Sequence, residues 1–219
     1  YADVCNCEIN SASDIEIKGN LVSTKLYTEG KLVVGGQIIG CRESYLHVWG
    51  DTICHSVIDS RLICKGSLHF AGEIREAQII AEKGVIGAET DSLIHSGSIQ
   101  SSGSITAAVI GNTEEEPVEI EITISAYYKN YLMIRTKELI KMKQNPEISP
   151  EVIDETSTEI KHLESELDRD MSVFLKHERL EKLTIKASQR LHANTTLRIL
   201  KHSYQIKHQE QDAEYREKD

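Results

Sequence analysis

The sequence has few aromatic residues and no long apolar run. Phenylalanine, tryptophan and tyrosine make up 5% of its 219 residues. The longest wholly apolar stretches have four or five residues, as at Ala107–Ile110, which excludes a membrane-spanning helix. No basic start followed by an apolar stretch is present, so no secretory signal is visible. Because Tyr1 is not an initiator methionine, we expect a fragment whose upstream domain is missing.

Positive charge is scarce as well. The chain has 25 basic and 35 acidic side chains, and this excess of acid argues against a nucleic-acid binder, which needs clustered Lys and Arg. The five cysteines are an odd number, which favours reduced thiols in a cytosolic protein over a complete disulfide framework. We expect no metal site and no cofactor, because the nearest candidate set has no zinc-ligand spacing: Cys54, His55, Cys64 and His69.

Glycine and proline divide the chain into two chemically different halves. All 13 glycines lie at or before Gly111, and all three prolines lie after it. Charged residues number 21 in positions 1–111 and 39 in positions 112–219, so their density almost doubles at the junction. This shift predicts a change of architecture near the acidic segment that ends at Pro117.

The first half carries an internal repeat. A Gly-x-apolar unit recurs seven times, with glycine at positions 19, 30, 66, 72, 84, 97 and 103. Apolar residues also recur every six positions, and after a one-residue slip the series continues: Leu62, Leu68, Ile74, Ile80, Ile86, then Leu93, Ile99 and Ile105. A period of six is too long for a helix and too regular for loops.

A parallel β-helix explains this period, with three six-residue sides in a coil of about 18 residues. The repeated apolar residue would point inward, and the glycine two positions earlier would allow the backbone angles of the corner. About 100 residues then give five or six coils. A β-sandwich with irregular turns is the alternative.

The second half begins with an alternating strand over Val118–Ile124 and then changes to a helical period. Apolar residues follow helical spacing from Ala126 to Gln144, with Arg135 as the one misfit on that face. A Pro-bounded turn follows, Ser149 is a good N-cap, and the second helix would reach about Leu180. Two such helices predict an antiparallel coiled-coil hairpin. The stretches Leu183–Ala187, Thr196–Leu200 and Tyr204–Lys207 again resemble strands that would return to cap the β-helix.

No catalytic constellation stands out. His69 and His95 could each act as a general base, as in left-handed β-helix acyltransferases with six-residue repeats. The densest aromatic cluster is formed by Tyr127, Tyr128 and Tyr131. Tyrosine is favoured in partner-binding hot spots, so these three are candidate partner-binding residues. The alternative is that they pack the base of the hairpin against the β-helix.

The order of these parts resembles a known family. The run Gly66–Ala88 is similar to the repeat of the FapA family, flagellar assembly protein A, and Leu191–Ile199 resembles the strand-forming close of that family. The chain departs from the family pattern at Asn194-Thr195, where members generally carry a Pro-Gly pair. By this resemblance we expect the N-terminal domain of the family to be missing from this fragment.

The resemblance implies a right-handed β-helix related to that of the cell-division inhibitor MinC. It also implies a cytoplasmic protein without catalytic residues, acting in bacterial flagellar assembly or polar localisation. A sugar phosphotransferase regulator is a candidate partner by resemblance only.

We therefore predict a mainly β protein with an α insertion. Residues 1–124 form the parallel β-helix, 125–182 the hairpin, and 183–219 the returning strands. The expected function is that of a non-enzymatic scaffold or adaptor that binds other proteins, with homo-oligomers allowed and neither nucleic acid nor membrane insertion involved. A bactofilin-like filament protein and a hexapeptide-repeat acyltransferase are the alternatives.

Overall fold

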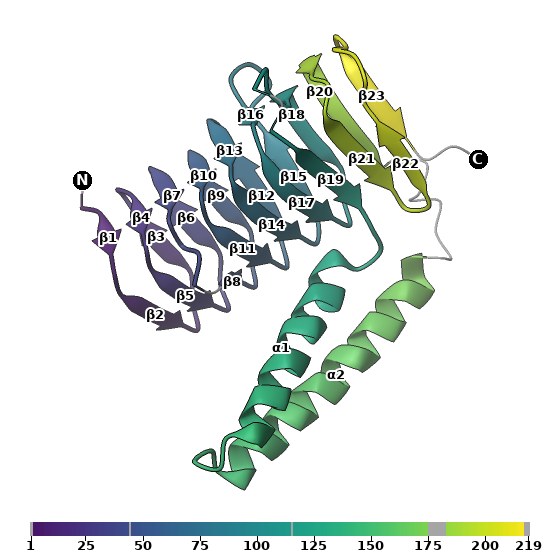
Figure 1. The fold of residues 1–219 in the computed structure, drawn as a ribbon. Coiled ribbons are helices and arrows are strands. Elements are labelled where there is room, and N and C mark those ends of the chain that lie inside the picture. The colour runs from purple at the N-terminus through teal and green to yellow at the C-terminus, as the bar shows by residue number, and fades with distance from the viewer. Residues whose placement is uncertain (1, 44, 115, 175–182, 217–219) are drawn as a thin grey trace.

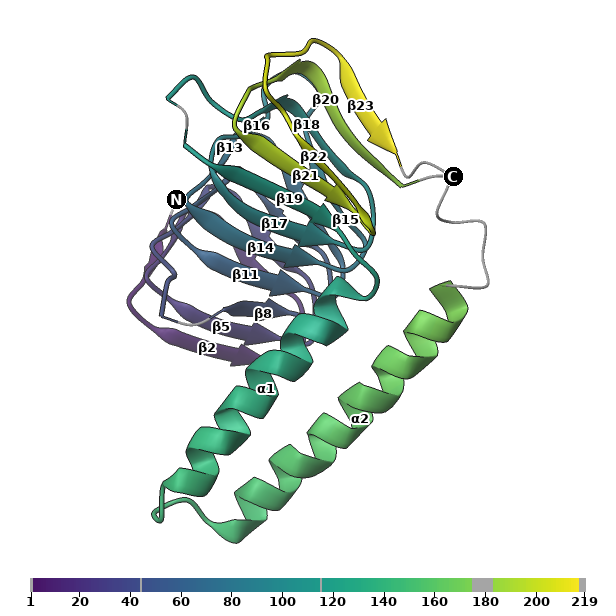
Figure 2. The same cartoon turned by 45° about the vertical axis from the view of Figure 1, so that its right-hand side comes forward.

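The computed structural model describes residues 2–43, 45–114, 116–174 and 183–216. Short strands stack into a parallel β-solenoid of about six turns, with one helix against its side and a second helix beside the first (Figures 1 and 2). The prediction of a parallel β-helix is thereby confirmed, and the β-sandwich is wrong. Each turn of the solenoid contributes one strand to each of three faces.

Face 1 and face 3 are the two sides without helices. Face 1 has six parallel strands: β1 (Val4–Cys5), β4 (Leu21–Val22), β7 (Gln37–Ile39), β10 (Ser56–Ile58), β13 (Glu73–Arg75) and β16 (Leu93–Ile94). Face 3 has five: β3 (Ile15–Ile17), β6 (Leu32–Val34), β9 (Thr52–Cys54), β12 (Ser67–Phe70) and β15 (Gly84–Gly87). The longer strand β18 (Ile105–Ile110) pairs with both β15 and β16, so it joins these two faces into one sheet.

Face 2 carries the helices. Its parallel strands are β2 (Glu8–Ser11), β5 (Lys25–Thr28), β8 (Leu46–Val48), β11 (Arg61–Cys64), β14 (Ala77–Ala81), β17 (Gly97–Ser101), β19 (Val118–Ile122) and β21 (Thr195–Ile199). Helix α1 (Ala126–Gln144) and helix α2 (Pro150–Phe174) follow β19, and Figure 2 shows them antiparallel, with α1 lying across face 2. The predicted end of the second helix near Leu180 lies outside the described residues.

The last strands return to the solenoid and cover its C-terminal end. Strand β20 (Thr184–Leu191) adds in parallel to β18, and β21 adds in parallel to β19. Two further strands then pair antiparallel: β22 (His202–Gln205) with β21, and β23 (Ala213–Arg216) with β20. These antiparallel pairs end the parallel stack. The edges of β20 and β21 are covered by the short strands β23 and β22.

The coil is shorter than expected, and this shifts the inward positions. Leu62 pairs with Ile79 across 17 residues, not 18. From this point the expected Ile80 and Ile86 are wrong as core residues. Ile79 is 1% exposed in the core, whereas Ile80 packs beneath α1 and Ile86 is 41% exposed. The 88–92 loop lengthens the next coil, and the predicted inward positions are correct again from Ile99.

At the next inward position Ile94 is fully buried, whereas the expected Leu93 is half-buried. Ile99 and Ile105 face inward as expected and are also fully buried.

Most of the repeat glycines are required for space and not for backbone angle. A Cβ at Gly66 would lie 2.3 Å from the Asp51 side chain in the coil before it. The same Asp51 carboxylate accepts the N–H of Ser67 at 2.8 Å. The carboxylates of Asp3 and Asp14 accept hydrogen bonds from the backbone N–H groups of Asn20 and Lys31 in the same way. An aspartate side chain therefore holds each of these corners together. Among the seven units, a positive φ is found at only two glycines, Gly84 and Gly97.

Candidate functional site

Helix α1 is held on face 2 by a second apolar cluster outside the solenoid. Ile63 and Ile80 point outward from neighbouring strands and pack against Tyr127, Tyr128 and other residues of α1 and α2. Tyr127 is 2% exposed, as completely buried as the residues inside the solenoid. Burying a large side chain of this kind stabilises the docked helix by roughly 1.5–3 kcal/mol. The helices are therefore attached by packing as well as by the chain connection.

The solenoid also caps the first turn of α1. Ser125 precedes the helix in a left-handed conformation, with φ of 52°, and its side chain makes no cap hydrogen bond. Instead the Glu82 carboxylate accepts the Tyr127 N–H at 2.8 Å, and the Ser102 hydroxyl accepts the Ala126 N–H at 2.6 Å. Burial raises the pKa of Glu82 to about 7, against the lowering effect of the hydrogen bonds that Glu82 accepts from the Tyr127 N–H and the Ser102 side chain. A partly buried carboxyl group thus fixes where the helix begins.

A second buried titratable group, His47, lies beneath α1. Its Nε2 and the Tyr127 hydroxyl form a hydrogen bond of 2.7 Å. The imidazole ring also lies between Tyr27 and Tyr131, with centroid separations of 5.2 and 4.3 Å. Burial, and then the positive charge of Arg135, lowers the pKa of His47 to about 4, so the ring is neutral at pH 7.

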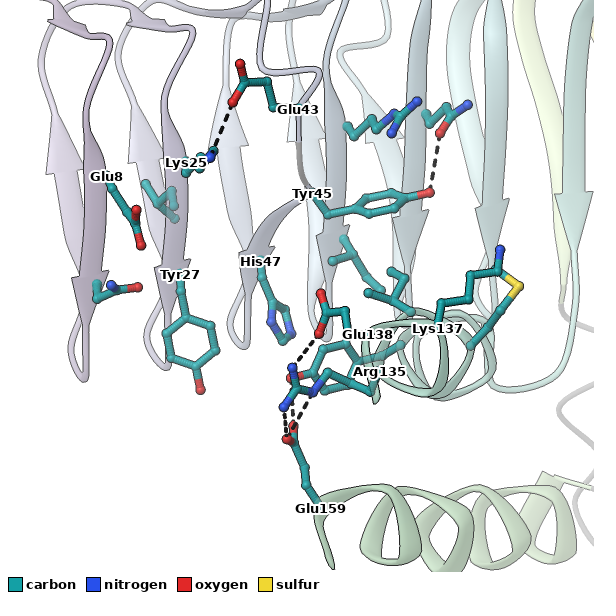
Figure 3. Close-up of a pocket in the computed structure, with 18 of the residues that line it drawn as sticks. Glu8, Lys25, Tyr27, Glu43, Tyr45, His47, Arg135, Lys137, Glu138 and Glu159 are labelled. Carbon is teal, nitrogen blue, oxygen red and sulfur yellow. Dashed lines mark hydrogen bonds and ion pairs between the residues drawn. The ribbon is translucent and has the colours of Figure 1, made fainter. Parts of the chain in front are cut away.

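A charged network joins α1 to α2. Arg135 donates from Nε to a carboxylate oxygen of Glu159 at 3.0 Å, and it forms a second ion pair with Glu138. The Tyr131 hydroxyl donates to the other Glu159 oxygen at 2.8 Å. Figure 3 shows this network beside His47, below the strands of face 2. Arg135, the misfit of the apolar helix face, is therefore one of the residues that link the two helices.

A groove of about 840 Å³ runs between the N-terminal coils of face 2 and helix α1 (Figure 3). One wall comes from strands β2, β5, β8, β11 and β14 of face 2 and the residues next to them, and it includes Tyr27, Tyr45 and Arg61. The other wall comes from the middle of α1 and includes Met133 and Lys137. The volume falls within the range of ligand-binding clefts, about 300–1,000 Å³. This groove is the candidate functional site.

The structure places the three predicted tyrosines at the base of the helices. Tyr127 and Tyr128 are buried, and Tyr131 is half-buried in the wall of the groove. The Tyr127 ring meets that of Tyr128 edge to face, with 5.2 Å between centroids, and stacks on that of Tyr131 at 5.5 Å. Contact of a partner with these residues remains a prediction, and Tyr131 is the one that lines an accessible surface.

Other residues considered for chemistry lie apart. His69 is in strand β12 of face 3, whereas His95 follows strand β16 of face 1 and lies 3.4 Å from Glu116. Cys54 and Cys64 are buried in the core, and burial raises the pKa of both thiols to about 12. Within the described ranges, no group of three His, Cys, Asp or Glu side chains could hold a metal ion.

Neither His47 nor Glu82 was identified from the sequence as a site residue. Each occupies an outward position in or next to an ordinary alternating strand, and nothing in that pattern says that a helix covers it. Arg135 did give a signal, because a charged residue interrupts an otherwise apolar stripe. In the part of the chain that the structure describes, no helix is long and apolar enough to cross a membrane.

Comparison with known families gives a match over nearly the whole chain. The model of the family described as "Flagellar Assembly Protein A beta solenoid domain" matches residues 5–219 of the chain. Comparison with the curated proteins and with the solved structures gives no match. The match covers the solenoid, both helices and the returning strands, so the whole described architecture falls within the family.

Proposed function

Because the chain belongs to the FapA family, we propose that it acts as a non-enzymatic scaffold or adaptor in bacterial flagellar assembly. The family match over residues 5–219 is the observation that carries this proposal. The family is named for an assembly process and not for a reaction. A rigid solenoid with a laterally attached helix pair offers long surfaces on which other proteins can be held in a fixed arrangement.

The finer parts of the proposal concern geometry. We take the two helices as an antiparallel coiled coil, with residues 125–182 as a unit between the solenoid at 1–124 and the returning strands at 183–219. We take the solenoid as right-handed, like the family it resembles. The helix pair supplies one binding surface and the solenoid another, so two partners could be held by one molecule.

The proposed location is the cytoplasm, at the cell pole where flagella are assembled. Partners in this proposal are flagellar or polar proteins, with a sugar phosphotransferase regulator as a further partner and self-association allowed. Neither nucleic acid nor a cofactor is part of the proposed function.

Deletion of the gene in a flagellated bacterium that encodes this chain tests the proposal. We expect fewer or misplaced flagella, counted by fluorescence microscopy of stained filaments, and restoration by a plasmid copy. Unchanged number and placement of flagella in the deletion strain would contradict it. Imaging of a fluorescent fusion in the same cells tests the location, and a uniform distribution would argue against the pole.

A further inference from the structure

The groove beside α1 is positively charged, although the chain as a whole has a net charge of −10. Five basic and four acidic residues line it. Most of these neutralise one another, since Lys25 pairs with Glu43 at 3.3 Å and Arg135 pairs with both Glu138 and Glu159. Three cations remain without an ion pair to a described residue: Arg61, Lys137 and Lys141. The lining as a whole carries one more positive than negative charge.

These three cations come from both walls. Arg61 belongs to strand β11, whereas Lys137 and Lys141 are one turn apart on α1. All three side chains are exposed. Figure 3 shows Tyr45 on the strand side and Lys137 on the helix side of the opening. A ligand in the groove would therefore meet positive charge from two sides, which favours an elongated anion over a single point charge.

The groove also has an apolar component. Met133 lines it and is 46% exposed, so its side chain is accessible to a ligand in the groove. Ile63 and Ile134 lie in the same lining, and Tyr45 adds an aromatic ring. Tyrosine and methionine are both enriched in protein-binding surfaces. Apolar and positive groups are thus interleaved along one opening.

We propose that this groove binds an acidic, amphipathic segment of a partner protein. Apolar side chains of the segment would contact Met133, Ile134 and Tyr45, and its carboxylates would pair with Lys137, Lys141 and Arg61. The inference rests on the proposed scaffold function and names the chemistry of one partner. Helical spacing of the acidic and apolar groups suits the groove, because Lys137 and Lys141 themselves repeat at one helical turn.

A peptide pair tests this inference. The probe is a fluorescein-labelled helical peptide of about 14 residues, with leucine at helical spacing and glutamate elsewhere. A second peptide carries lysine in place of each glutamate. We expect fluorescence anisotropy to detect binding of the glutamate peptide alone, and the affinity should fall as salt is raised.

Two matched variants locate the binding. Lys137→Glu with Lys141→Glu should weaken binding of the glutamate peptide about tenfold or more. Lys143→Glu with Lys161→Glu makes the same change of net charge outside the groove and should leave binding unchanged. Circular dichroism checks that both variants fold. No binding to the unmodified protein, equal binding of both peptides, or equal losses in the two variants would overturn the inference.

The outcome is separable from that of the proposed function. If the Lys137→Glu, Lys141→Glu variant still restores flagella to the deletion strain and the peptide does not bind, the groove inference fails and the scaffold function stands. If the deletion strain itself has normal flagella, the scaffold function fails whatever the peptide does.

Discussion

The inside of the solenoid and the interface beneath α1 both bury large side chains, but they are built in opposite ways. Inside, aliphatic residues such as Leu62 and Ile79 stack on their equivalents in the next coil and are almost fully buried. Beneath α1, Tyr127, His47 and Glu82 meet once, through directed hydrogen bonds. The core is repetitive and apolar, whereas the interface is unique and titratable.

Because of this difference, the stability of the solenoid and the docking of the helices should depend on pH in different ways. Repeated apolar stacking supplies stability that depends little on pH, since apolar groups do not titrate. The helix interface places a histidine and a carboxyl group in positions where their charged forms are disfavoured. Docking of the helices should therefore respond to conditions that leave the solenoid unaffected.

The largest effect should come from the core. Ile79→Ala should lower the free energy of unfolding by about 2–5 kcal/mol, because the side chain is buried between two neighbouring coils and leaves a cavity. Ile86→Ala is the matched control, since Ile86 is 41% exposed and the change should cost under about 1 kcal/mol. Urea unfolding measures both. Equal losses would mean that the inward phase of this coil is wrongly assigned.

The next effect concerns His47. Its folded-state pKa of about 4 lies below the ordinary 6.5, so the unfolded chain binds more protons between these values. The contribution of His47 to stability should therefore be lost as pH falls from 6.5 to 4, by roughly 3 kcal/mol in total. In His47→Gln this loss should disappear. Urea unfolding at a series of pH values checks it, and an unchanged pH profile in the variant would contradict the assignment.

Glu82 should act in the opposite direction and somewhat less strongly, because it keeps partial contact with solvent. Its pKa is raised from 4.5 to about 7, so the folded protein binds more protons in that window. Stability from this group is present at low pH and lost as pH rises to 7, by roughly 2–3 kcal/mol. Glu82→Gln should therefore be more stable than the unmodified protein at pH 8.

Between pH 4.5 and 6.5 the opposite effects of His47 and Glu82 on stability nearly cancel in the unmodified protein. Each single variant should therefore reveal the pH dependence that the other group contributes. In Glu82→Gln the acid-induced loss from His47 should become steeper, and in His47→Gln stability should rise as pH falls. A flat profile in both single variants would show that neither group is buried as described.

The smallest effect should come from the ion pairs of the helices. Arg135→Lys removes the guanidinium fork that holds Glu159 and should cost about 1 kcal/mol. Arg169→Lys is the control, because its pair with Glu166 has an arginine side chain that is 65% exposed. It should cost close to nothing. Thermal unfolding that follows α-helix content by circular dichroism compares the two, and equal shifts would argue that Arg135 has no special position.

The fold was predictable because a solenoid repeats its physical requirements. Each coil needs an inward apolar residue and a small residue at the corner, so the Gly-x-apolar unit is visible without any tertiary information. The phase was lost at Ile80 because coil length is set by corner geometry, here 17 residues between paired positions, and a six-residue count cannot detect the missing residue. The role of most repeat glycines was also predicted wrongly. They leave space for a side chain of the neighbouring coil, such as Asp51, and the repeat alone does not reveal that contact.

The site was far less predictable because it forms where two different elements meet. The tyrosine cluster at Tyr127 was visible in the sequence, but its hydrogen bond to His47 joins residues 80 positions apart. The spacing of residues along the chain does not indicate which strands a helix will cover. Lys137 and Arg61 appear in the sequence as ordinary surface charges, and their common groove exists only once α1 lies on face 2.

The late return of strands β20 and β21 has a consequence for the order of folding. Within the first six coils, paired residues are separated by about one coil, as in repeat proteins that fold by nearest-neighbour propagation. Ile105 and Ile185, by contrast, pair across 80 residues. Closing that longer loop costs roughly 1.4 kcal/mol more chain entropy. During synthesis the edges of β18 and β19 therefore stay open until the last strands have left the ribosome, and in that interval the nascent chain is most exposed to pairing with a second molecule.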